Sequence, residues 1–119
     1  MTEQQAERSP AVAIANAIVR IHKEGYGKGA TLARTRMLDD VIVVELEDIL
    51  TRVEHTLLAA GRDNQIRETR QIFQQSQREA FVGAVEEITG RKVRAFFSQV
   101  DFNPDIAVEV FLLEPEGND

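Results

Sequence analysis

The chain has 119 residues, no cysteine and a formal net charge of −6. This length corresponds to one domain, and the 43% hydrophobic content is typical of a soluble folded protein. The acidic excess argues against nucleic acid as the main partner, because such binders carry a positive surface. The lack of cysteine excludes thiol nucleophiles, disulfides and thiolate metal sites.

The sequence predicts no membrane-spanning segment. The longest apolar run, Ala11 to Val19, is interrupted by Asn16 and falls far short of the ~20 residues that a span needs. The segment before this run has two glutamates and one arginine, whereas secretion signals begin with a positive segment. We therefore expect a cytoplasmic protein without direct membrane insertion. Residues 1–8 are expected to be a disordered tail, 9–113 a single domain and 114–119 an acidic tail.

A first helix is predicted to begin at Ser9-Pro10, because proline already has the φ of a first helical position. Ile14, Ile18 and Ile21 have the three- and four-residue spacing of an amphipathic helix. Gly25 is the expected end of this helix, because glycine adopts the left-handed cap conformation without steric cost.

The stretch EGYGKGA, Glu24 to Ala30, has the composition of a phosphate-binding loop but not its context. Such loops lead from a strand into a helix, and Lys is followed by Ser or Thr. Here the order is helix to strand, and Lys28 is followed by Gly29. The glycines therefore either cap the helix and link it to a strand, or form a functional loop that presents Tyr26 and Lys28.

Two β-rich runs around Asp39-Asp40 predict a hairpin that closes at Leu38 and Val41. In this register Met37 faces Ile42, Thr35 faces Val44, Ala33 faces Leu46, and Arg34 lies opposite Glu45. The predicted apolar face consists of Ala33, Met37, Ile42, Val44 and Leu46.

Two helices are predicted next. Thr51 and Glu54 have the spacing of a capping box, which begins a short helix that runs to Ala60. Asp63 is the expected cap of a second, long helix that ends at Gly90.

A second hairpin is predicted in residues 93–113, with its turn in Phe102-Asn-Pro-Asp105. Its predicted core face consists of Val93, Ala95 and Phe97 with Val108, Val110 and Leu112. The opposite face then carries Phe96, Val100, Phe111 and Leu113 beside Arg94 and Glu109. That second face is too apolar to remain in water, so we expect a homo-oligomer, in the first place a dimer, to bury it.

The sum is an α+β fold in the order α-β-β-α-α-β-β. We predict that the two hairpins join into one four-stranded antiparallel sheet, with the helices on one face and the other face buried in the oligomer.

Arg70 interrupts the apolar stripe of the long predicted helix between Ile66 and Phe73, where a charge is costly unless paired. Glu54 is its expected partner. The pair is either a structural ion pair that joins two helices, or Arg70 is an anion-binding arginine.

Two further arginines, Arg34 and Arg36, share one strand face with Glu45. They form either a solvated ion pair or, with Tyr26, Lys28 and Arg70, the candidate ligand- or partner-binding set. His22 and His55 lie on different predicted helices with no carboxylates at ligand spacing, so neither a metal nor a cofactor is predicted. No Ser/His/Asp set indicates a catalytic site, which favours a non-enzymatic protein.

The order of GYGKGA, LTRVE, RQIF, VEEITGRKV and FNPD resembles a family of bacterial domains named after the Na-translocating system protein MpsC. The resemblance covers Ser9 to Leu113. The family commonly has proline where this chain has Ala30. The positions that match the family pattern are Gly27, Lys28, Gly29, Thr51, Glu54, Arg70, Phe73, Glu86 and Gly90.

This resemblance implies a soluble accessory of a membrane system for ion or inorganic-carbon transport. The surplus apolar sheet face and the lack of a catalytic set favour a protein that acts through protein contacts. The alternative is a small-anion or metabolite-binding domain or enzyme that uses the Lys/Arg cluster beside the glycine-rich loop.

Overall fold

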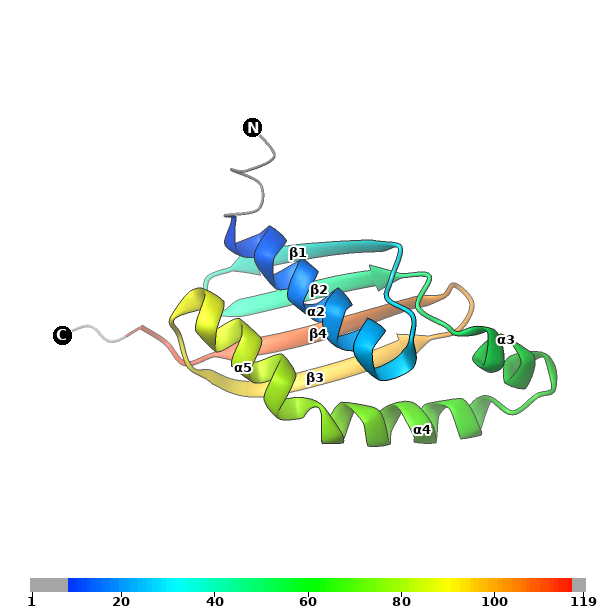
Figure 1. The fold of residues 1–119 in the computed structure, drawn as a ribbon. Coiled ribbons are helices and arrows are strands. Elements are labelled where there is room, and N and C mark those ends of the chain that lie inside the picture. The colour runs from blue at the N-terminus through cyan, green and yellow to red at the C-terminus, as the bar shows by residue number, and fades with distance from the viewer. Residues whose placement is uncertain (1–8, 117–119) are drawn as a thin grey trace.

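A computed structural model describes residues 9–116 of the chain (Figure 1). The predicted tail at 1–8 and the last three residues of the predicted acidic tail lie outside the described part. The elements are, in chain order, α2 (Pro10–Tyr26), β1 (Leu32–Leu38), β2 (Val41–Glu47), α3 (Arg52–Ala59), α4 (Asp63–Ser76), α5 (Arg78–Thr89), β3 (Val93–Asp101) and β4 (Ile106–Leu113).

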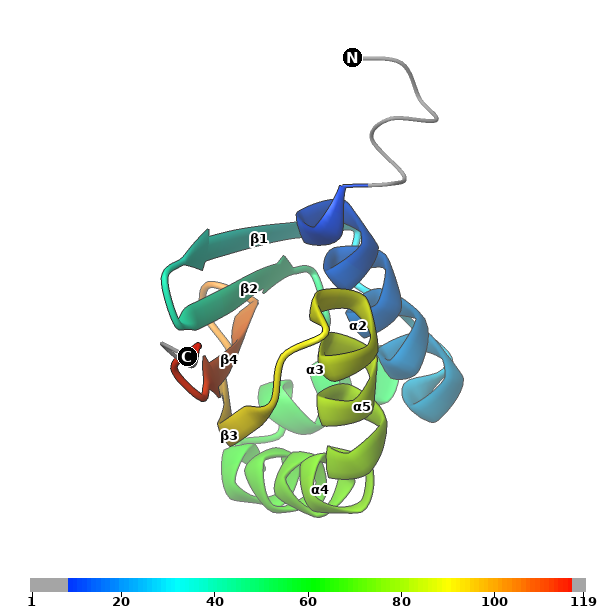
Figure 2. The ribbon, with the colours of Figure 1, turned by 90° about the vertical axis from the view of Figure 1, so that its left-hand side faces the viewer.

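The strands form one antiparallel sheet in the order β1-β2-β4-β3, which confirms the predicted α+β fold of two joined hairpins. The first hairpin has the predicted register, with Leu38 opposite Val41 and Arg34 opposite Glu45. Helices α2 and α5 lie side by side over one face of the sheet, and no described helix covers the other face (Figure 2). We call this other face the open face.

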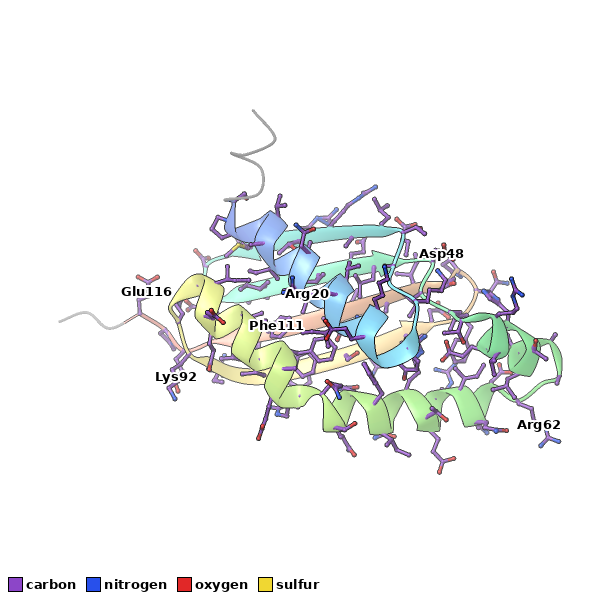
Figure 3. All side chains as sticks on the ribbon, in the orientation of Figure 1. Arg20, Asp48, Arg62, Lys92, Phe111 and Glu116 are labelled. Carbon is purple, nitrogen blue, oxygen red and sulfur yellow. The ribbon has the colours of Figure 1, made fainter. Side chains whose placement is uncertain are left out.

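The core lies between these two helices and the sheet. Ile14 and Ile18 of α2, Phe81 of α5, and Val44 and Phe111 of the sheet are almost fully buried. Phe111 projects from the central strand β4 into this space (Figure 3). The isoleucines of α2 therefore lie on the side of the helix that packs against the sheet, as their spacing predicts.

The predicted faces of the second hairpin are wrong. Phe96, Phe111 and Leu113 are buried under the helices, together with Glu109, whereas Phe97 is 53% exposed on the opposite face. An irregularity between Val93 and Ala95 also shifts the register there, so that Val93 packs against the core. Glu109, which the prediction placed on the face opposite the core, is accommodated inside.

The long helix predicted after Asp63 consists of two helices. It is interrupted at Gln77 (φ −103°, ψ 6°), between the polar stretch of α4 and the apolar stretch of α5. Helix α5 packs beside α2 and ends at Gly90 as predicted. Helix α4 runs along the side of the edge strand β3 and past the end of the sheet, where α3 lies (Figure 1). Asp63 is not the cap, because it is the first residue of the helix itself. The residue at the cap position is Arg62, whose side chain makes no cap bond.

The first helix also ends later than predicted. It continues through Gly25 to Tyr26, and Gly27 is its left-handed cap (φ 76°), with its N–H bonded to the carbonyl of Lys23. Gly25 has another purpose. A Cβ atom at this position would lie 2.0 Å from Cε1 of Phe73, so the absence of a side chain allows the Phe73 ring to lie against the helix.

Candidate functional site

A cleft of about 350 Å³ separates α4 from the edge strand β3. It exists because α4, unlike α2 and α5, does not pack on the sheet. Its walls and floor are formed by His22, Arg67, Arg70, Gln71, Phe73, Gln74, Gln75, Phe81, Phe97, Ser98, Gln99, Val100 and Glu109. The volume lies in the range of small-molecule sites, and the lining mixes charged, amide and aromatic side chains.

A buried histidine–glutamate pair lies at the cleft. Nε2 of His22 is 3.3 Å from Oε1 of Glu109, and the two residues are 6% and 1% exposed. The other ring nitrogen, Nδ1, is 3.0 Å from the carbonyl oxygen of Ile18. A carbonyl only accepts, so Nδ1 carries the proton of this hydrogen bond. Helix α2 therefore fixes the ring, and Nε2 faces one of the two oxygens of Glu109.

A row of packed aromatic rings leads from the His22–Glu109 pair into the core. Phe73 lies between Tyr26, with ring centroids 4.3 Å apart, and Phe81, at 6.2 Å. Phe81 in turn packs on Phe96, and Phe96 on Phe111, at 5.4 Å and 4.9 Å. These contacts connect α4 to the sheet through side chains from five elements, so one face of the cleft is rigid and apolar.

An ion pair in the middle of α4 joins this helix to α3. Nε of Arg70 donates to Oε2 of Glu54 at 2.7 Å, and both side chains are buried. The guanidinium also lies 4.2 Å from the ring centroid of Tyr26. Burial raises the pKa of Glu54, but the hydrogen bonds from Arg70 and Thr51 outweigh it and hold this pKa below its usual value.

Tyr26, one of the predicted site residues, is enclosed at this point. Its hydroxyl oxygen is buried and has no hydrogen-bond partner among the described residues. Burial raises the pKa of the Tyr26 phenol to about 12, against an opposing effect of the positive charge of Arg70.

The other predicted site residues lie elsewhere. Lys28 donates to the carbonyl of Asp48 at 2.6 Å and contacts its carboxylate at 3.3 Å; Asp48 lies where β2 ends (Figure 3). Arg34 and Arg36 are exposed on the open face, where Arg36 is 3.6 Å from Glu45. The structure thus brings Tyr26 and Arg70 together but does not gather the five candidates into one site.

A comparison with protein-family models finds a match over residues 6–115 to the family described as the Na+-translocating membrane potential-generating system (MpsC). This match covers nearly the whole chain. The chain belongs to the MpsC family. Among curated proteins, it is 30% identical over 101 residues to the uncharacterized protein YbcI of Bacillus subtilis (strain 168), and the alignment covers 84% of this chain and 82% of YbcI. No solved structure matches it significantly.

The family is named after a membrane system, so we note whether the described residues could span a membrane or bind a metal ion. Within residues 9–116, no helix has the length and apolar character to cross a bilayer. In the same part of the chain, no three His, Asp or Glu side chains come together in a way that could hold a metal ion.

The sequence did not single out Glu109 or the pairing of His22 with it. One signal was present for His22, which follows Ile14 and Ile18 at four-residue intervals on the buried face of its helix. Glu109 interrupts an otherwise apolar strand, and a charge at such a position is equally compatible with exposure. Only the three-dimensional proximity of the two side chains identifies the pair.

Proposed function

We propose that this MpsC-family chain is a non-enzymatic, cytoplasmic homodimer that acts through protein contacts as an accessory of a Na+-translocating, membrane potential-generating assembly. The family match supports the link to that system. The open face of the sheet is the observation that supports a role in protein contacts, because it is apolar and no described helix covers it.

The apolar part of the open face extends over three neighbouring strands of the sheet. Val43, Val110 and Phe97 are neighbours on β2, β4 and β3, and Val41, Leu112 and Ala95 form the next row. Phe97 is 53% exposed and Val41 37%. Monomeric proteins rarely leave a continuous apolar patch of this kind in water.

A second copy suits this face because both signs of charge border the patch. Arg34 and Arg36 lie on β1, whereas Glu45 and Glu47 lie on β2. A two-fold interface brings the same surface of both copies together, so it requires a surface that complements itself. A face with an apolar centre and mixed charges at its border meets this requirement, and a uniformly charged face does not.

The homodimer is tested by light scattering coupled to gel filtration at micromolar concentration. We expect a dimer for the natural chain and a monomer for Phe97→Glu, because the new carboxylate would be buried in the interface. Ile72→Glu is the matched control. Ile72 is 62% exposed on α4, away from the sheet, so this variant should remain dimeric. A monomeric natural chain would contradict the proposed dimer.

The accessory role is tested separately in the cell that makes the protein. The chain is tagged, crosslinked and purified from the membrane fraction, and its partners are identified by mass spectrometry. We expect subunits of an ion-translocating membrane complex, and a smaller membrane potential when the chain is deleted. Recovery of this chain alone, with an unchanged potential, would rule out the accessory role.

A further inference from the structure

We propose that the cleft between α4 and β3 binds a small zwitterion of the amino-acid type, with its ammonium group on Glu109 and its carboxylate toward Arg67. The cleft shares Phe97 with the open face of the sheet, but the proposal does not depend on the dimer.

The first observation is an unsatisfied carboxylate oxygen at the cleft. Glu109 is 1% exposed, and its Oε2 atom is buried without a hydrogen-bond partner among the described residues. Its Oε1 atom faces Nε2 of His22 at 3.3 Å. A buried acceptor without a donor costs free energy, so this oxygen is suited to a ligand that brings an N–H or O–H group.

The second observation is that His22 cannot turn to serve this oxygen. Its Nδ1–H is engaged by the carbonyl of Ile18 at 3.0 Å, and its ring packs against Phe73 and Phe81 with centroids 5.9 Å and 5.3 Å apart. The ring is therefore fixed from both sides. The described residues supply no donor to the free oxygen of Glu109, and Glu109 is one of the residues that line the cleft.

The third observation is the positive charge on the opposite wall. Arg67 on α4 is exposed and stacks its guanidinium on the Phe102 ring at 4.5 Å. No carboxylate of residues 9–116 lies within ion-pair distance of Arg67, whereas the charge of Arg70 is matched by Glu54. The stacked guanidinium is held in place while its N–H groups remain available to a carboxylate.

These charges select the class of ligand. A simple cation would suit Glu109 but would be repelled by Arg67, and a simple anion would suit Arg67 but would approach the buried carboxylate of Glu109. A zwitterion satisfies both. The side chains of Gln71, Gln74 and Gln99 also line the cleft, and their amide groups can hydrogen-bond polar atoms of the ligand. The volume of about 350 Å³ accommodates a single small molecule of this kind.

The proposal is tested with the ¹⁵N-labelled full chain by NMR and by thermal unfolding. The probes are the protein amino acids one at a time, with n-butylamine and sodium butyrate as molecules that carry only one of the two charges. We expect at least one amino acid to shift the amide signals of Ser98 and Gln99 and, at a hundredfold excess over its Kd, to raise the Tm by about 5 °C or more. Butylamine and butyrate should have neither effect.

Two substitutions locate the ligand. Glu109→Gln removes the acceptor charge, and Arg67→Gln removes the guanidinium at an exposed position that should not affect folding. Each should weaken binding of the responding amino acid at least about tenfold. Glu45→Gln is the matched control. Glu45 lies on the neighbouring strand β2 and on the open face, so this variant should bind the amino acid with the affinity of the natural chain.

Three results would overturn the proposal. The first is that no amino acid shifts the signals of the cleft, which would mean that water alone occupies it. The second is an equal response to butylamine or butyrate. The third is that Arg67→Gln binds the amino acid with unchanged affinity. This variant keeps the proposal testable even if Glu109→Gln does not fold.

Discussion

Arg70 on α4 and Glu54 on α3 form a buried, two-bonded ion pair in which Nε and Nη2 donate to the two carboxylate oxygens at 2.7 Å and 2.5 Å. The same carboxylate accepts the N–H of Thr51 at 2.9 Å, and Nη2 also donates to the carbonyl of Ile49 at 3.1 Å. One pair thus caps α3, holds α4 and connects both to the segment that follows β2. Together with the packing of the Phe73 ring between Tyr26 and Phe81, this pair sets the position of α4, which forms one wall of the cleft.

We expect Arg70→Met to lower the free energy of unfolding by about 3–5 kcal/mol, because it leaves the Glu54 carboxylate buried without its partner. The double variant Glu54→Met/Arg70→Met should recover part of this loss, since it removes both charges. Urea denaturation followed by circular dichroism measures each value.

The matched control for this prediction is Arg52→Met on the exposed side of α3, which should change the free energy by less than about 0.5 kcal/mol. If Arg70→Met behaved like Arg52→Met, the pair would have no role in stability.

The same pair should make stability depend on acid pH. The pKa of Glu54 is 4.5 in a model peptide and lower in the folded chain. Its contribution is therefore complete above about pH 4.5 and is lost as the pH falls through the lower folded value, because the unfolded chain takes up the proton first. Unfolding free energies measured across this range should fall less steeply for Glu54→Gln than for the natural chain. Parallel curves would show that Glu54 is not the group responsible.

The first hairpin could be predicted in full from the sequence because its two faces differ. Alternation places Ile42, Val44 and Leu46 on one side and Glu45 and Glu47 on the other, so only one register buries the apolar set. The fold class followed from the same pattern, together with the spacing of isoleucines in α2.

The second hairpin could not be oriented from the sequence because both of its faces are apolar. Phe96 and Phe97 are adjacent and point to opposite sides, and the prediction placed Glu109 with Phe96 on the face away from the core, which is the wrong side for both. The orientation depends on His22, which lies 87 positions earlier in the chain and supplies the partner that makes burial of Glu109 acceptable. The cleft could not be predicted from the sequence either, because the elements that form it are distant from one another along the chain.

Tyr26 should titrate well above an ordinary tyrosine. It is the only tyrosine of a chain without tryptophan, so the ultraviolet absorbance of its phenolate can be followed directly. We expect a pKa of about 12 in the folded chain and 10.0 in urea, because burial disfavours the phenolate. The sign for stability follows from this shift. The unfolded chain releases the proton first, so the stability associated with Tyr26 is complete below pH 10 and declines toward pH 12.

The control for the titration is Tyr26→Phe, whose unfolding free energy should depend less on pH in this range than that of the natural chain. A folded-state value equal to the value in urea would show that the phenol is open to solvent.

The glycines of this chain should respond differently to alanine according to their surroundings. Gly25→Ala places a Cβ 2.0 Å from Cε1 of Phe73, and we expect a loss of about 1–3 kcal/mol in unfolding free energy. Gly83→Ala on α5 is the matched control, because a Cβ there meets nothing within 4 Å, and it should stabilise by about 0.4–1 kcal/mol.

The cause of the loss at Gly25 can be isolated with Phe73→Leu, which removes the ring that the new Cβ would meet. If the clash is the cause, Gly25→Ala should cost much less in the Phe73→Leu background than in the natural chain, and a double-mutant cycle by urea denaturation measures this coupling. Strict additivity of the two changes would assign the effect to the backbone of the helix end instead. The coupling would show that Gly25 is retained for the aromatic packing that carries α4, while Gly27 alone, at φ 76°, ends the helix.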